Sequence, residues 1–183
     1  MKIFVGCSSR TIGNPDYDRV ADGIGEWIAE NGHAFVFGGC GEGLMGRIYR
    51  KVAAGHGEIH ATQAKVYQDE LDGLDIKDEN KHVIDTINQR KDFYAQLADV
   101  LVYIPGGIGT LDELISGIET RRSGEHENPI VIVNVNNFFG PVLEMLDKIY
   151  DEGLATRETT EKLYYVAGTL EDALKKLTEI CNK

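Results

Sequence analysis

ADVLVYIPGGIGTLDEL, residues 98–114, places an apolar run, a glycine-rich turn and a helix-forming segment next to one another. The run Ala98–Tyr103 is typical of a strand in the middle of a parallel sheet. The segment LDELISGIE, which begins at Leu111, is read as a helix. A strand that turns through glycines into a helix leaves backbone N–H groups free at the positive end of the helix dipole, where an anion can bind. This stretch therefore predicts an α/β fold with a phosphate-binding turn.

The alternation of apolar runs and amphipathic segments continues along the chain. Apolar runs predict six strands, at residues 2–7, 33–39, 58–66, 100–106, 129–135 and 163–168. Helical patterns lie at residues 17–31, 44–54, 87–98, 111–119 and 169–182. This order predicts one domain over residues 1–183, with a Rossmann-like, doubly wound parallel sheet flanked by helices. The polar segment 69–80 is predicted to be a surface excursion.

Composition narrows the classes of function. A net charge of −11 and an isoelectric point near 4.9 argue against nucleic-acid binding, because phosphate backbones attract basic surfaces. No apolar run approaches the roughly 18 residues of a membrane span, and MKIFVG leads into a strand, so we expect a cytoplasmic protein without a membrane partner. Three widely spaced cysteines and five scattered histidines predict neither a disulfide framework nor a metal site.

Glycine-rich turns follow three of the predicted strands, and in a doubly wound sheet such turns meet at one edge. The second of them, GGCGEGLMG, contains Gly41, Gly43 and Gly46 in the G-x-G-x-x-G spacing of dinucleotide sites, with Asp69 or Glu70 as a possible ribose ligand. That fingerprint normally follows the first strand, whereas this one follows the second. Tight turning and close helix packing are the competing explanation of these glycines.

The turn PGGIGTLDE is the stronger signal. Thr110 is predicted to cap the helix while its hydroxyl remains available to an anion. A capping box formed by Thr110 and Glu113 would explain those two residues without any ligand. It leaves Gly106, Gly107 and Gly109 unexplained, so a binding site is favoured.

Together, PGGIGTLDE, GGCGEGLMG and INQRKDFY resemble the LOG family, the cytokinin riboside 5′-monophosphate phosphoribohydrolases, which are often mislabelled lysine decarboxylases. The similarity covers most of the chain, and P-G-G-x-G-T-x-x-E is its most specific element. The resemblance implies a Rossmann-like fold, a homodimer and no cofactor. It also implies hydrolysis of the N-glycosidic bond of a nucleoside 5′-monophosphate, which gives the free base and ribose 5-phosphate.

Carried over to this sequence, the resemblance implies that Arg90 and Glu113 are catalytic. The substrate- and phosphate-binding residues that it implies are Ser8, Gly39, Gly43, Met45, Gly46, Lys91, Gly106, Gly107, Gly109 and Thr110. Two segments depart from the family pattern: Ile87–Gln89 replace a Met-His pair before the Arg-Lys pair, and GIETRRSG lacks a tryptophan that is common there. These departures leave the preferred base open, from adenine to an N6-isoprenoid adenine.

The implied chemistry suits these residue types. Cleavage of an N-glycosidic bond passes through an oxocarbenium-like sugar, which a carboxylate such as Glu113 can stabilise while it orients water. We expect Glu113 on the first turn of its helix, close to the ribose of a nucleotide whose phosphate lies at the helix N-terminus. Arg90 would bind substrate oxygens or keep Glu113 ionised; without the resemblance it reads as a surface arginine. The neighbouring Asp112 is expected to be peripheral.

Two other functions remain open at this point. One is a non-catalytic nucleotide-binding protein of the same fold, and the other is a dinucleotide-dependent enzyme that uses Gly41–Gly46. Lysine decarboxylation is disfavoured, because it needs pyridoxal phosphate on a Schiff-base lysine and no lysine lies in the glycine-rich turns. If two subunits share the site, Arg121 and Arg122 are candidates to reach the neighbouring subunit.

Overall fold

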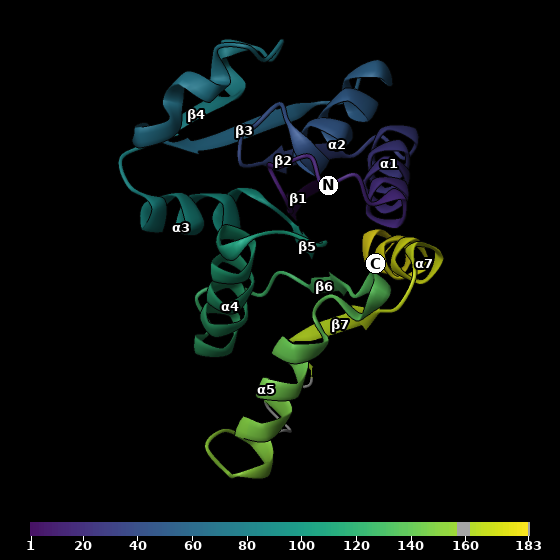
Figure 1. Ribbon diagram of the computed structural model, residues 1–183. Coiled ribbons are helices and arrows are strands. Elements are labelled where there is room, and N and C mark those ends of the chain that lie inside the picture. The colour runs from purple at the N-terminus through teal and green to yellow at the C-terminus, as the bar shows by residue number, and fades with distance from the viewer. Residues whose placement is uncertain (157–161, 183) are drawn as a thin grey trace.

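A computed structural model describes residues 1–156 and 162–182 of the chain. Its centre is a parallel sheet of seven strands in the order β4-β3-β2-β1-β5-β6-β7 (Figure 1). The strands are β1 (Lys2–Gly6), β2 (Ala34–Phe37), β3 (Ile59–Ala64), β4 (Lys81–Ile84), β5 (Val100–Tyr103), β6 (Ile130–Val133) and β7 (Tyr164–Ala167). The doubly wound parallel sheet predicted from the sequence is therefore confirmed.

Helices cover both faces of the sheet. They are α1 (Pro15–Glu30), α2 (Gly43–Ala54), α3 (Ile87–Leu97), α4 (Ile108–Ser123), α5 (Gly140–Asp151) and α7 (Leu170–Cys181), with short 3₁₀ turns η1 (Lys65–Leu71), η2 (Asp78–Asn80) and η3 (Val135–Asn137). In Figure 1, α1, α2 and α7 lie together on one side of the sheet, and α3 and α4 lie on the other.

The alternation of side chains along β1 explains the two layers. Ile3 and Val5 point to the core beneath α1, α2 and α7, whereas Phe4 points to the core beneath α3 and α4. The Phe4 ring stacks on Tyr94 of α3, with ring centroids 3.8 Å apart. Central strands are buried on both faces, so their sequences read as nearly continuous apolar runs.

The order of the strands reverses at β1, which pairs with β2 on one side and β5 on the other. The loops that follow β1 and β5 therefore diverge to opposite faces, and in open α/β sheets ligands bind in the crevice between such loops. In this register Gly6 lies beside Tyr103, at the carboxyl ends of the two strands.

Three features of the fold differ from the prediction. Strand β4 was not predicted, because Lys81–Ile84 is a short edge strand of mixed polarity. Helix α5 was not predicted either. The segment 69–80 is only partly a surface excursion: Leu71, Leu74 and Ile76 are buried in the core beneath α2. Across the described residues, no helix is both long enough and apolar enough to cross a membrane.

Candidate active site

A cavity of about 530 Å³ opens at the carboxyl ends of β1, β2 and β5, a volume that suits a ligand of nucleotide size. We call it the main cavity. It is the crevice that the strand order predicts, and loops from both halves of the sheet contribute to it. Seven of the residues proposed from the sequence line it: Ser8, Met45, Arg90, Gly107, Gly109, Thr110 and Glu113.

Arg90 and Glu113 form an ion pair in the wall of the main cavity. Arg90 Nη2 donates to Glu113 Oε1 at 2.5 Å, although the two residues come from different helices, α3 and α4. Their side chains are 12% and 4% exposed. Arg90 Nη1 also approaches the Thr62 carbonyl at 3.5 Å. Arg90 is therefore not the surface arginine that local sequence would suggest.

Two glycines make room for this pair. A Cβ on Gly38, just after β2, would lie 3.0 Å from Arg90 Nη1. A Cβ on Gly6, at the end of β1, would lie 3.0 Å from Glu113 Oε2 and 2.8 Å from the Tyr103 ring. A side chain at either position would crowd the ion pair, and at Gly6 it would also press on the Tyr103 ring.

Burial raises the pKa of Glu113 above its ordinary value, and the adjacent Arg90 opposes that rise. Burial and Arg90 thus shift the pKa of Glu113 in opposite directions, so this pKa depends on the position of Arg90. A raised carboxyl pKa is one of the ways in which active sites bring an acid closer to neutral pH.

The backbone of Glu113 is also held in place by a contact with the sheet. The Tyr103 hydroxyl on β5 donates to the Glu113 carbonyl at 3.0 Å. Gly117, one turn further along α4, leaves space for that hydroxyl, because a Cβ there would lie 2.8 Å from it. The buried hydroxyl of Tyr94 interacts in turn with Tyr103. These contacts hold the second turn of α4 against the sheet.

The start of α4 corrects two predictions. The helix begins at Ile108 with Gly107 as its N-cap, so Thr110 is the third helical residue and does not cap it. Glu113 consequently lies on the second turn, not the first. Thr110 packs on Gly106, where a side chain would clash with it. The capping prediction failed because a glycine can occupy the N-cap position as well as a threonine can.

The N-terminus of α4 has donors to offer a ligand. Within the described residues, the backbone N–H groups of Ile108, Gly109 and Thr110 have no acceptor, as is usual for the first turn of a helix. The Thr110 hydroxyl has no hydrogen-bond partner there either, although Thr110 is only 3% exposed. These donors face the main cavity and suit an anion.

The N-terminus of α2 is arranged differently. The N–H groups of Leu44 and Met45 already donate to the Ser8 carbonyl, at 3.0 and 3.2 Å. Gly43 has a φ of +59°, and a Cβ there would lie 2.6 Å from the backbone of Ser9. Gly46 packs closely on the Gly41 carbonyl. Gly43 and Gly46 thus serve turning and close packing. Of the first helical residues of α2, Gly43 to Gly46, Met45 alone lines the main cavity.

The remaining proposed residues lie close to the main cavity without lining it. Gly39 has a φ of +79° and turns the chain beside Leu71. Lys91 Nζ holds both carboxylate oxygens of Asp112, at 2.9 and 3.0 Å. Asp112, expected to be peripheral, does line the main cavity, but its carboxylate is engaged by this lysine.

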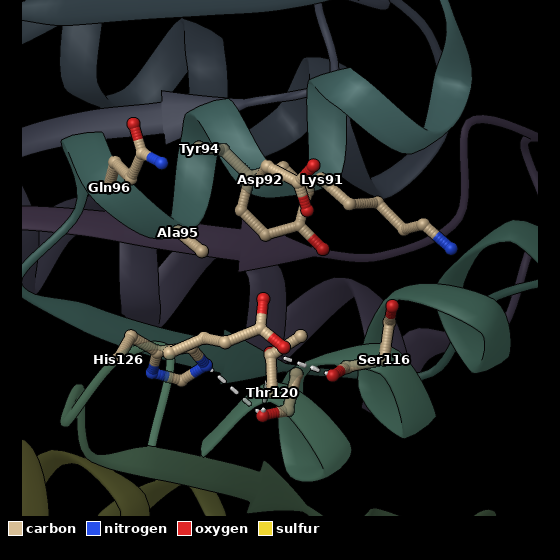
Figure 2. Close-up of a pocket in the computed structure, with 10 residues that line it drawn as sticks. Lys91, Asp92, Tyr94, Ala95, Gln96, Ser116, Thr120 and His126 are labelled. Atoms are coloured by element: carbon tan, nitrogen blue, oxygen red, sulfur yellow. Dashed lines mark hydrogen bonds between the residues drawn. The ribbon is translucent and has the colours of Figure 1, made fainter. Parts of the chain in front are cut away.

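Lys91 instead lines a second, small cavity between α3 and α4. Figure 2 shows Lys91 and Tyr94 on one helix facing Ser116 and Thr120 on the other, with His126 at one end. Its volume is about 40 Å³, which is enough for a few water molecules but far too little for a nucleotide. The small cavity is therefore not the substrate site.

Several lining residues are not among the substrate-binding residues that the resemblance implies, and Glu70 entered only as a possible ribose ligand of the dinucleotide alternative. Gln63, at the end of β3, donates to Glu70 at 2.9 Å, so Glu70 presents its carboxylate to the main cavity. Tyr67, Ile87 and Ile108 place partly or largely exposed apolar side chains at the same cavity. The available signal was the place of Ile108 within the glycine-rich turn PGGIGT; Tyr67 and Ile87 lie beside no such turn. The other members of the lining are Cys7, Ser9, Arg10, Gly38, Cys40 and Ala64.

Comparisons with known proteins identify the family. The family described as "possible lysine decarboxylase" matches residues 45–177. A cytokinin riboside 5′-monophosphate phosphoribohydrolase of Arabidopsis thaliana is 31% identical over 97% of this chain and 81% of its own length. A probable enzyme of the same name from Oryza sativa subsp. japonica is 28% identical over 97% of this chain and 76% of its own.

Among solved structures, the molybdenum cofactor carrier protein of Chlamydomonas reinhardtii is similar, with a TM-score of 0.64 and 21% identity, over 100% of this chain and 99% of that one. At that identity the likeness concerns the fold alone. The family match and the relatives named above carry the assignment: the chain belongs to the LOG family of phosphoribohydrolases.

Proposed function

We propose that this protein hydrolyses the N-glycosidic bond of an adenine-type nucleoside 5′-monophosphate, releasing the free base and ribose 5-phosphate. One observation carries the proposal: the buried Glu113 carboxylate lies in the wall of the main cavity, on the same helix whose free N-terminal amides face that cavity. A single helix thus brings an anion-binding end and an acid to one ligand.

In the proposed mechanism, the 5′-phosphate binds the N–H groups of Ile108–Thr110 and the Thr110 hydroxyl. This fixes the ribose along α4, near Glu113. As the bond from C1′ to the base breaks, the base leaves with the electron pair, and the ionised Glu113 stabilises the positive charge that develops on the sugar. Water then adds its oxygen to C1′ and loses a proton, and the departing base takes up one proton.

Arg90 has a supporting part in this scheme. Its contact with Glu113 favours the ionised carboxylate, which is the form that the reaction needs. Its Nε is buried and has no hydrogen-bond partner among the described residues.

Two observations support the class of base that we propose: the names of the relatives and the apolar side chains that line the main cavity. The relatives named above carry the name of cytokinin riboside 5′-monophosphate as their substrate. Tyr67, Ile87 and Ile108 add apolar surface that would suit an apolar substituent on the base, and Ile108 is 87% exposed without a ligand. We therefore propose N6-substituted adenine nucleotides as the better substrates and AMP as the weaker one.

Lysine decarboxylation, which the family description suggests, is less compatible with the cavity. Among the described residues that line it there is no lysine to form a Schiff base with pyridoxal phosphate. The cavity instead offers amide donors and an arginine–glutamate pair, which suit hydrolysis of a phosphorylated nucleoside.

Assembly and location are part of the same proposal. We propose that the protein acts as a homodimer, as the resemblance implies, and that it works in the cytoplasm, as expected from the sequence. Large apolar side chains such as Met145 on α5 and Leu154 just beyond it are exposed in the monomer, as expected of a surface that a second subunit covers. Light scattering on the purified protein tests this, and a monomer at micromolar concentration would contradict it.

Product release tests the proposed reaction. Wild-type protein incubated with AMP or N6-isopentenyl-AMP should release free base, detected by chromatography. Glu113→Gln should abolish release, whereas Glu119→Gln, the same change at an exposed position of the same helix, should not. Binding of these nucleotides without turnover would indicate a non-catalytic nucleotide-binding protein, and a stoichiometric NAD spectrum would indicate a dinucleotide-dependent enzyme.

A further inference from the structure

The Arg10 guanidinium has no partner among the described residues, and in this it differs from the other arginines that the structure describes. It makes no ion pair and donates no hydrogen bond there. Each of the others contacts a carboxylate or a backbone carbonyl: Arg19, Arg47, Arg50, Arg90, Arg121 and Arg122. The chain has a net charge of −11, and Arg10, whose guanidinium contacts neither a carboxylate nor a carbonyl among the described residues, lines the main cavity.

The backbone that carries Arg10 is firmly held. The Ser8 hydroxyl accepts from the Arg10 N–H at 3.0 Å and donates to the Arg10 carbonyl at 3.1 Å. Gly43 lets α2 approach, because a Cβ there would lie 2.7 Å from the Arg10 nitrogen. The position of the Arg10 Cα is thus fixed while its side chain remains free, which is the arrangement expected of a residue that closes on a ligand.

The Arg10 loop adjoins the anion-binding end of α4. The Ser8 N–H donates to the Pro105 carbonyl at 3.2 Å, which ties the loop after β1 to the turn that precedes α4. Arg10 therefore shares the main cavity with the free amides of Ile108–Thr110.

The charges of the residues that line the main cavity indicate a role for Arg10. The main cavity carries three carboxylates, Glu70, Asp112 and Glu113. They would repel a phosphate dianion, and the two other nearby cations are already engaged: Arg90 contacts Glu113 and Lys91 contacts Asp112. Arg10 is the cation that remains available to offset that repulsion, and a guanidinium suits phosphate geometry.

We propose that Arg10 is a specificity-determining residue that binds the 5′-phosphate of the substrate together with the α4 amides, and so selects phosphorylated over unphosphorylated nucleosides. This inference rests on the proposed function for its substrate. Ser8, which the family resemblance marks as a phosphate ligand, would then act by fixing the Arg10 loop.

The test compares Arg10→Gln and Arg10→Lys with the wild type. Arg10→Gln should lower kcat/KM for the nucleoside 5′-monophosphate on the order of ten- to hundredfold, the usual effect of losing a charged hydrogen bond, and leave kcat/KM for the unphosphorylated nucleoside unchanged. Arg10→Lys should restore part of the loss, because it keeps the charge but not the bidentate geometry. Arg19→Gln removes the same charge at an exposed site and should match the wild type.

Calorimetric titration with ribose 5-phosphate gives a second measurement that does not depend on turnover. Arg10→Gln should weaken this binding by a similar factor. Equal affinity in the variant and the wild type, or equal losses for phosphorylated and unphosphorylated nucleosides, would overturn the role of Arg10. If the wild type releases no base, the proposed function fails, whereas the titration still decides whether Arg10 binds the phosphate.

Discussion

Replacement of Arg90 by methionine tests how the ion pair controls Glu113. Methionine has a comparable length and no charge, so the carboxyl group stays buried but loses its neighbour. Burial already raises the pKa of Glu113, and Arg90 is what opposes that rise. An adjacent arginine typically lowers a carboxyl pKa by about 1 to 3 units. Its removal should raise the pKa of Glu113 further by an amount in that range.

Two measurable consequences follow from this shift. In the proposed mechanism the ionised carboxylate is the active form, so the acidic limb of kcat/KM against pH should move to higher pH in Arg90→Met, by about 1 to 3 units. Stability should change with pH as well. A carboxyl whose pKa is higher in the folded than in the unfolded protein favours folding at low pH, and this contribution is lost as pH rises from about 4.3 through the folded value.

The size of the stability change can be bounded. Removing one partner of a buried pair costs roughly 3–5 kcal/mol, because it leaves an uncompensated charge. For Arg90→Met this cost should be largest above the raised pKa of Glu113 and should shrink toward pH 4. In the double variant Arg90→Met, Glu113→Gln no charge remains, so most of the pH dependence should vanish.

The assays are a pH series of initial rates and urea unfolding followed by circular dichroism at pH 5 and pH 8. An acidic limb that stays in place in Arg90→Met would refute the reasoning. So would a loss of stability that is the same at both pH values, because it would mean that Arg90 acts through packing and not through the ionisation of Glu113.

Four further substitutions, one of them a control, have defined outcomes. Tyr103→Phe removes the hydroxyl that holds the Glu113 carbonyl and should cost about 1 kcal/mol in urea unfolding and lower kcat more than it changes KM; an unchanged kcat would show that the contact does not position Glu113. Gly43→Ala, at a φ of +59° and against the loop after β1, should lose roughly 1–3 kcal/mol, while Gly73→Ala, which meets nothing within 4 Å, should be nearly neutral; equal stabilities would contradict this account of Gly43. Thr110→Val should raise KM for the monophosphate several-fold and leave the thermal midpoint nearly unchanged, and an unaltered KM would remove the hydroxyl from the phosphate site.

The sequence predicted those elements whose residue pattern follows directly from their burial or from their turn residues. Val100–Tyr103 is apolar throughout because both faces of β5 are buried, and the following glycines allow an abrupt change from strand to helix. Strand β4 could not be recognised in the same way. Lys81–Ile84 lies at the edge of the sheet, where one side of the strand pairs with nothing and polar residues are tolerated.

The site was only partly predictable for a related reason. The pairing of Arg90 with Glu113 joins two helices whose relative position is set by packing on β1 and β5, and no spacing in the sequence encodes it. The family resemblance supplied both residues. Likewise, nothing local distinguishes Gly107 from Thr110 as the start of α4, because either residue is acceptable at an N-cap.

The contrast between the two glycine-rich helix starts limits what the molecule can hold. At the start of α2, the N–H groups of Leu44 and Met45 donate to the Ser8 carbonyl. At the start of α4, the N–H groups of Ile108, Gly109 and Thr110 have no acceptor among the described residues. A ligand with a pyrophosphate bridge could accept hydrogen bonds from the first amides of α4, but the leading amides of α2 are already bonded to the chain. A G-x-G-x-x-G spacing therefore says little about dinucleotides until the acceptors of its amides are known, and here Leu44 and Met45 already donate theirs to Ser8.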